Sequence, residues 1–182
     1  MGVNANTGVV ELAALVSQAL EAAGIKATLS GGGAVSIYTN NEYRSDDLDF
    51  VSAERRSRLS AALEPLGFTL ASDRRHFTHP DTELFLEFPP GPLEFGSRVV
   101  QHDDLPRMDT PWGSLRIITP TLCVMDRLAA YWHWRDRQSW DQAVLVARQQ
   151  EVDYAELTAY AKEQKADPHD IDKLRTQASR RS

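Results

Sequence analysis

Hydrophobic positions at the start of the chain recur first with the period of a helix and then with that of a strand. Between residues 9 and 23, apolar side chains return every three or four positions, and Gly24 follows them. This spacing predicts an α-helix with one apolar face that ends at the glycine. From Asp46 to Val51, polar and apolar residues alternate, which predicts a strand with one buried face.

Short apolar runs predict further elements up to residue 118. The run from Ile25 to Ser30 is a short strand that ends at three glycines, and Ala34 to Tyr38 forms a brief helix after them. Further strands are predicted at 68–71, 75–78, 82–88, around Val99 and at 114–118, with an amphipathic helix at 53–66. The segment PPGPLEFG, residues 89–96, is expected to be a loop, because its prolines have no N–H to donate to a strand ladder.

Beyond Pro120 the apolar residues recur with the spacing of helices. Apolar spacing predicts a helix at 122–132, and three start signals mark further helices. The signals are Ser139 with Gln142, which would open a helix at Trp140, Asp153 with Glu156, and Asp167 followed by Pro168. Helix–strand alternation followed by adjacent strands is typical of a mixed sheet. The expected fold class is therefore α+β, with a mixed β-sheet flanked by helices at residues 1–118 and a helical bundle at residues 119–182.

Length, composition and charge narrow the class of protein. A chain of 182 residues that is 42% hydrophobic can bury a substantial core, which excludes a disordered tail. The formal net charge of −6 means that the surface as a whole does not attract polyanions, so nucleic-acid binding would need a local basic patch. One candidate patch is formed by Arg55, Arg56, Arg58, Arg74 and Arg75, for which a solvated helix face is the alternative.

The single cysteine and the lack of long apolar segments indicate the compartment. Cys123 excludes an internal disulfide and fits a reducing cytoplasm, and its apolar neighbours predict that it is buried. No stretch approaches the ~20 apolar residues that span a bilayer, so no membrane partner is expected. The start MGVNANTG has neither the basic flank nor the apolar core of a signal peptide. We therefore expect a cytoplasmic protein.

Two aspartates in the strand at 46–51 are the first candidates for chemistry. Residues two apart in a strand point the same way, so Asp47 and Asp49 share a face while Leu48 and Phe50 pack beneath them. Two neighbouring carboxylates favour a hard cation such as Mg²⁺ or Mn²⁺. The alternative is an exposed strand face with two solvated aspartates.

Three consecutive glycines precede this strand. Gly31, Gly32 and Gly33 lie at a predicted strand-to-helix turn, where glycine lets backbone N–H groups approach a phosphate closely. No Gly-Lys-Ser/Thr follows, which excludes a Walker loop, and the next glycine after them is Gly67, which excludes the dinucleotide fingerprint. Taken alone, a triple glycine is more often just a flexible turn.

A third carboxylate is available from the strand at 82–88. Alternation along this strand places Glu87 on the face opposite Leu86 and Phe88, and Glu83 shares its parity four residues earlier. If the strands are neighbours, Glu87 would lie beside the aspartate pair. Three carboxylates can hold two metal ions ~3.5–4 Å apart, which is the arrangement used for in-line displacement at phosphorus.

The ordered series of glycine turn, Asp-x-Asp and strand glutamate resembles the nucleotidyltransferase fold of the DNA polymerase beta superfamily. The minimal members of that superfamily, among them the AbiE-system toxins, are similar in layout. The matching segments are Gly31-Gly32-Gly33-Ala34, Arg44-Ser-Asp-Asp47-Leu-Asp49-Phe, Leu86-Glu87-Phe88 and the later TPTLCVMDRLAAYWHWRDRQSWDQA. The resemblance covers residues 9 to 150 and implies a nucleotidyltransferase-like α/β domain at 1–118.

This resemblance implies roles for individual residues. Gly31 and Gly32 would hold the triphosphate of an NTP, while Asp47 and Asp49 would ligate the metals. The third carboxylate, as ligand or as base for the acceptor hydroxyl, would be Glu87.

The resemblance also implies phosphate-binding arginines and partners. Arg44 could reach a phosphate, with a surface charge as the alternative, and Arg127 stands where these toxins tend to carry a lysine. The acceptor of the nucleoside monophosphate could be tRNA, a protein or a small molecule, and a cognate antitoxin or toxin protein is a possible partner. The alternatives are a catalytically inactive binding module, suggested by the arginine at 127, and a phosphohydrolase with water as acceptor.

Histidines and tryptophans give weaker signals. The five histidines (His76, His79, His102, His133 and His169) have no metal-ligand spacing and are interpreted as surface or packing residues. Trp132 and Trp140 are expected in a helix–helix core, with base stacking as the alternative, and the role of Trp134 is left open.

Overall fold

A five-stranded mixed sheet forms the centre of the first part of the chain. The computed structural model describes residues 2–180. The sheet has the order β1-β2-β5-β4-β3, with β1 (Thr28–Ser30), β2 (Asp47–Val51), β3 (Thr69–Leu70), β4 (Phe77–His79) and β5 (Thr82–Glu87). β2 and β5 run parallel, while the other neighbouring pairs are antiparallel. The α+β fold class with a mixed sheet is confirmed.

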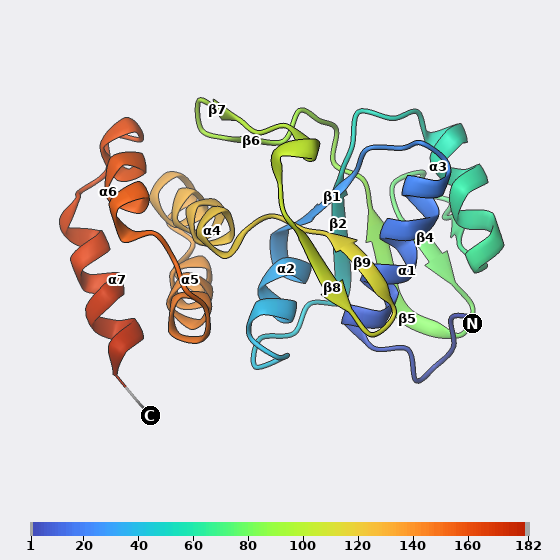
Figure 1. The fold of residues 1–182 in the computed structure, drawn as a ribbon, viewed down its shortest axis with the longest axis horizontal. Coiled ribbons are helices and arrows are strands. Elements are labelled where there is room, and N and C mark those ends of the chain that lie inside the picture. Colours follow the sequence, from blue (N-terminus) through green and yellow to red (C-terminus); the bar gives the residue numbers. More distant parts are fainter. Residues whose placement is uncertain (1, 181–182) are drawn as a thin grey trace.

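Three helices and two small hairpins accompany this sheet, and one of the hairpins extends away from it (Figure 1). The helices are α1 (Val9–Ala22), α2 (Gly31–Tyr38) and α3 (Arg56–Leu63), the last continued by a 3₁₀ turn at Glu64–Leu66. The hairpins pair β6 (Glu94–Phe95) with β7 (Arg98–Val99), and β8 (Arg107–Thr110) with β9 (Gly113–Arg116). A second 3₁₀ turn lies at His102–Asp104.

Four helices follow and lie beside the sheet, beyond α2 (Figure 1). They are α4 (Pro120–Trp134), α5 (Arg137–Gln149), α6 (Tyr154–Glu163) and α7 (His169–Ser179). Arg98 of β7 donates from Nε and Nη2 to Glu163 of α6, at 2.8 Å each. This bidentate pair fastens the β6–β7 hairpin to the helices. No helix within residues 2–180 is both long and apolar enough to cross a membrane.

One hydrophobic cluster joins the sheet to the helices. Leu48, Phe50 and Leu86 fill the centre of the sheet and are fully buried, and Leu128 of α4 belongs to the same cluster. Cys123 is also fully buried, as its apolar neighbours predict, and this burial raises the pKa of its thiol. The packing therefore holds α4 firmly against the α/β part.

Several element boundaries differ from the sequence prediction. Residues 89–96 are not entirely loop, because Glu94–Phe95 comes after the last proline and can pair with β7. The helix α2 begins at the glycines and not at Ala34. The strand β8 was not predicted, since its sequence RMDT is polar.

The start of α5 was predicted three residues too late. Its N-cap is Asp136, whose carboxylate accepts from the backbone N–H of Gln138 and from the hydroxyl of Ser139. Ser139 is therefore a donor inside the helix and not the cap. At α6 the prediction is confirmed, because the side chain of Asp153 accepts from the N–H of Glu156 at 2.9 Å.

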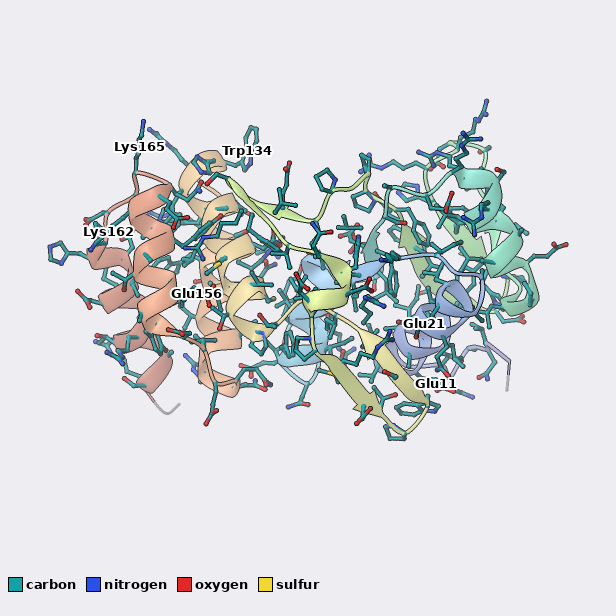
Figure 2. All side chains as sticks on the ribbon, turned by 45° about the horizontal axis from the view of Figure 1, so that its top comes forward. Glu11, Glu21, Trp134, Glu156, Lys162 and Lys165 are labelled. Carbon is teal, nitrogen blue, oxygen red and sulfur yellow. The ribbon has the colours of Figure 1, made fainter. Side chains whose placement is uncertain are left out.

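The tryptophans of the helical part differ in exposure. Trp132 and Trp140 are partly buried, and both donate from Nε1 to α7, to Asp170 and Gln177 respectively. Their expected place between helices is confirmed. Trp134 is 82% exposed and projects from the end of α4, as Figure 2 shows.

Candidate functional site

The three glycines form the first turn of α2 and press against the segment 45–49. Gly31 has φ +61°, a conformation that residues with a side chain rarely adopt, and a Cβ at this position would overlap Asp49 Oδ2. A Cβ on Gly32 would lie 2.6 Å from Ser45 Oγ, and one on Gly33 would lie 2.7 Å from a methyl of Leu48. The glycine turn and the aspartate strand are therefore in direct contact.

Asp47 and Asp49 lie on one face of β2, as alternation predicts. Both are half-buried, while Leu48 and Phe50 between and after them are fully buried. The hydroxyl of Ser45 donates to Asp47 Oδ1, which fixes that carboxylate from the preceding turn.

Strand pairing selects Glu87 over Glu83. In the parallel pair β2–β5, Asp49 lies opposite Glu87, so their side chains are neighbours on the same face. Glu83 lies near the start of β5 and lines a separate hollow of about 860 Å³ with Asp46 and Asp81. That hollow is larger, but none of its lining residues carries a positive charge.

A cavity of about 350 Å³ collects most of the candidate residues. Its polar and glycine lining is Ser30, Gly31, Asp49, Arg75, Glu87, Glu94, Asp126 and Arg127, and its remaining walls come from Val51 and the segment 89–95. Gly32, Arg44 and Asp47 are not among its lining residues. The cavity therefore lies where the glycine turn, the strands β2 and β5, the β6–β7 hairpin and α4 meet.

The electrostatics of the cavity favour a cation. Burial raises the pKa of Asp49 to about 7, and repulsion by the neighbouring carboxylates of Asp47 and Glu87 adds to the effect, while Arg127 opposes it. Without a cation in the site, the charged form of Asp49 is therefore disfavoured. A hard divalent cation bound by Asp47 and Asp49 would relieve this repulsion, so the aspartate pair fits Mg²⁺ or Mn²⁺.

The third carboxylate is engaged by two side chains. Glu87 Oε1 lies 2.6 Å from His76 Nε2, and Glu87 Oε2 accepts from Arg75 Nε at 2.9 Å. The other ring nitrogen of His76 contacts Asp73, which, together with Glu87, raises the pKa of His76. Within residues 2–180, no group of three His, Cys, Asp or Glu side chains is arranged to hold a metal ion. Each oxygen of Glu87 thus already has one partner, and the loss of either partner would leave that oxygen freer to join the aspartate pair.

The two arginines expected to bind phosphate lie in different surroundings. Arg127 lines the cavity, but its Nε and Nη2 donate to Asp126 and its Nη1 donates to Gln142 at 3.2 Å. Arg44 is exposed in the loop before β2. The structure thus brings Gly31, Asp49 and Glu87 together with Arg127 and leaves Arg44 outside the cavity.

Two residues at this site were missed by sequence reasoning. Arg75 was interpreted as part of a solvated patch and His76 as a surface or packing residue, yet both contact Glu87. Their approach depends on the pairing of β4 with β5, where Phe77 lies opposite Leu86 after a shift in register. A register shift has no signal in the residue types of either strand.

Comparison with known proteins supports the fold. No protein-family model matches the chain, and no curated protein sequence matches it. The crystal structure of an antigenic nucleotidyltransferase-like protein from Paracoccidioides brasiliensis is similar, with a TM-score of 0.54 and 14% identity over 79% of this chain and 76% of that chain. The chain therefore has a nucleotidyltransferase fold.

Two structures of the antibiotic-resistance factor ANT(2'')-Ia are more distantly similar. The solution structure covers 94% of this chain and 91% of that chain, with a TM-score of 0.48 and 14% identity. The match to the crystal structure in complex with adenylyl-2''-tobramycin covers 93% of this chain and 95% of that chain, with the same TM-score and identity. Because these TM-scores are lower, the fold assignment depends on the protein from Paracoccidioides brasiliensis.

Proposed function

We propose that this protein is a metal-dependent nucleotidyltransferase that moves a nucleoside monophosphate from an NTP to a hydroxyl group. The observation that carries the proposal is the contact of Gly31 with the carboxylate of Asp49 at the start of α2. A helix N-terminus without side chains can bind phosphate oxygens through backbone N–H groups, and here it adjoins a pair of aspartates suited to Mg²⁺ or Mn²⁺.

The residues of the cavity support an in-line displacement. Gly31 and Gly32 would position the triphosphate, and Asp47 and Asp49 would hold the metal. When bound, the metal would neutralise phosphate charge and activate the attacking oxygen. The acceptor oxygen would form a bond to the α-phosphorus, the bond to the bridging oxygen would break, and pyrophosphate would leave. The carboxylate of Glu87, next to Asp49, would take the acceptor proton or serve as a further ligand.

Replacement of Asp47 by asparagine tests this proposal. Asp47→Asn should reduce transfer of label from α-labelled NTP by at least a hundredfold, because one of two metal ligands is lost. Asp46→Asn removes the adjacent carboxylate, which is exposed and lines the separate hollow with Glu83, and should leave transfer unchanged. Equal transfer by the wild-type protein and Asp47→Asn would refute the metal assignment.

A second candidate function is a catalytically inactive module that holds a partner protein, for example as one half of a toxin–antitoxin pair. The pairing of Glu87 with Arg75 and His76, and of Arg127 with Asp126, favours it, because both candidate groups are already satisfied. The resemblance to AbiE-system toxins belongs to this proposal as well as to the first.

Thermal unfolding with Mg²⁺ and each NTP separates the two candidates. A functional site should raise Tm by about 5–10 °C at a ligand concentration of a hundred times Kd, since ligand binding stabilises the folded state. An inactive module should show no shift with any of the four nucleotides. Product analysis then distinguishes transfer to tRNA, protein or a small molecule from hydrolysis, because only transfer leaves a nucleotide on the acceptor.

A further inference from the structure

The cavity contains two guanidinium groups, and they differ in how far their hydrogen bonds are satisfied. Arg127 is mostly buried and uses all three of its nitrogens on Asp126 and Gln142. The side chain of Arg75 is 69% exposed, and its single hydrogen bond runs from Nε to Glu87. Among residues 2–180, neither Nη group of Arg75 has a hydrogen-bond partner. Arg75 is therefore the guanidinium in this cavity that can accept a ligand.

We propose that Arg75 binds the polyphosphate of the incoming nucleotide and leaves Glu87 when it does so. This inference depends on the proposed function for its ligand. A guanidinium presents paired N–H donors that match phosphate oxygens, so a polyphosphate is a better partner than one carboxylate oxygen. The existing ion pair opposes this exchange only weakly, because Arg75 is largely in solvent.

The exchange would release one defined atom of the third carboxylate. His76 contacts Glu87 Oε1 and is itself held by Asp73, so it keeps the carboxylate in place after Arg75 leaves. Glu87 Oε2 then loses its only partner among the described residues, on the strand position next to Asp49. Arg75 thereby links the arrival of the nucleotide to the availability of Glu87 for a metal or for the acceptor proton.

The proposal makes two predictions of opposite sign for Arg75→Ala. Inorganic tripolyphosphate, titrated calorimetrically without metal, should bind about tenfold more weakly, because a charge-assisted contact is lost. Mn²⁺ alone should bind severalfold more tightly, because Glu87 Oε2 is already released and a positive charge has been removed. Arg75→Lys should recover part of the tripolyphosphate affinity, since an ammonium keeps the charge without the paired donors.

Arg56→Ala is the matched control. Arg56 is an exposed arginine at the start of α3 outside the cavity, so its removal changes the net charge equally and should alter neither affinity. If Arg75→Ala merely unfolded the turn between β3 and β4, tripolyphosphate and Mn²⁺ would both bind more weakly. That result would overturn the inference. Equal tripolyphosphate affinity for wild type and Arg75→Ala would overturn it as well.

The inference and the proposed function fail in different ways. If wild-type protein transfers nucleotide and Arg75→Ala binds tripolyphosphate as tightly as wild type does, only the role of Arg75 is overturned. Wild-type protein that binds neither tripolyphosphate nor Mn²⁺ would overturn both.

Discussion

Replacement of Asp49 by asparagine is expected to abolish nucleotidyl transfer and, at the same time, to stabilise the empty protein at pH 8. Loss of activity follows from the proposed function, in which Asp49 is a metal ligand facing the cavity. The gain in stability follows from the raised pKa of Asp49, because burial and the carboxylates of Asp47 and Glu87 disfavour its charged form.

The sign of the pH dependence is fixed by linkage. The pKa of Asp49 is about 7 in the folded protein and 3.8 as an ordinary aspartate, so between these values the folded state binds more protons. The contribution of Asp49 to the free energy of unfolding therefore falls as pH rises from 4 to 7 and stays low above 7. The free energy of unfolding of Asp49→Asn should be higher than that of wild type by on the order of 1–3 kcal/mol at pH 8, and the two values should be equal near pH 4.

Urea unfolding at several pH values between 4 and 8 measures this difference. The exposed neighbour Asp46, changed to asparagine, provides the control and should give a stability difference that does not grow with pH. A constant difference for Asp49→Asn across the range would show that Asp49 is not held in an unfavourable charged state. Addition of Mg²⁺ should reverse the order at pH 8, because the cation stabilises only the protein that keeps both aspartates.

Replacement of Gly31 by alanine is expected to have the second large effect, a loss of about 2–4 kcal/mol of stability together with loss of nucleotide binding. Two causes add: φ of +61° is strained for alanine, and its Cβ would overlap Asp49 Oδ2. Gly24→Ala separates them, because Gly24 has φ +68° with open space around it. The control variant Gly24→Ala should lose only about 1–2 kcal/mol of folding stability and should still bind nucleotide.

A double-variant cycle tests the contact itself. In a background with Asp49→Ala, the carboxylate that Gly31→Ala would overlap is absent, so the substitution should then lose no more stability than Gly24→Ala does. Chemical unfolding of the four proteins gives the coupling free energy between positions 31 and 49. If that coupling is near zero, the close approach of the glycine turn to the aspartate does not exist in solution.

Local pattern was sufficient for part of this site. Alternation along 46–51 correctly placed Asp47 and Asp49 on one face, because the period of a strand does not depend on its neighbours. The glycine run correctly marked the junction of strand and helix, although α2 begins three residues earlier than predicted. The resemblance singled out Glu87 over Glu83, and the parallel pairing of β5 with β2 places Glu87 opposite Asp49.

The partners of the charged residues could not be predicted in this way. An unshifted hairpin continued from His79 opposite Thr82 would bring Arg74 to Glu87, whereas the register shift brings His76 and Arg75 there. Arg127 is satisfied by Gln142 of the next helix as well as by its neighbour Asp126. Each of these contacts depends on how separate elements pack.

Backbone periodicity and glycine conformation thus settled, from residue types alone, the face that carries the two aspartates and the turn that precedes it. Strand register and helix packing decided which carboxylate lies opposite Asp49 and which arginine of the cavity has Nη groups without a partner among residues 2–180. The physical reason is range: strand period and turn conformation are properties of a few consecutive residues. Hydrogen-bond partners and burial, by contrast, arise from contacts between segments far apart in the chain.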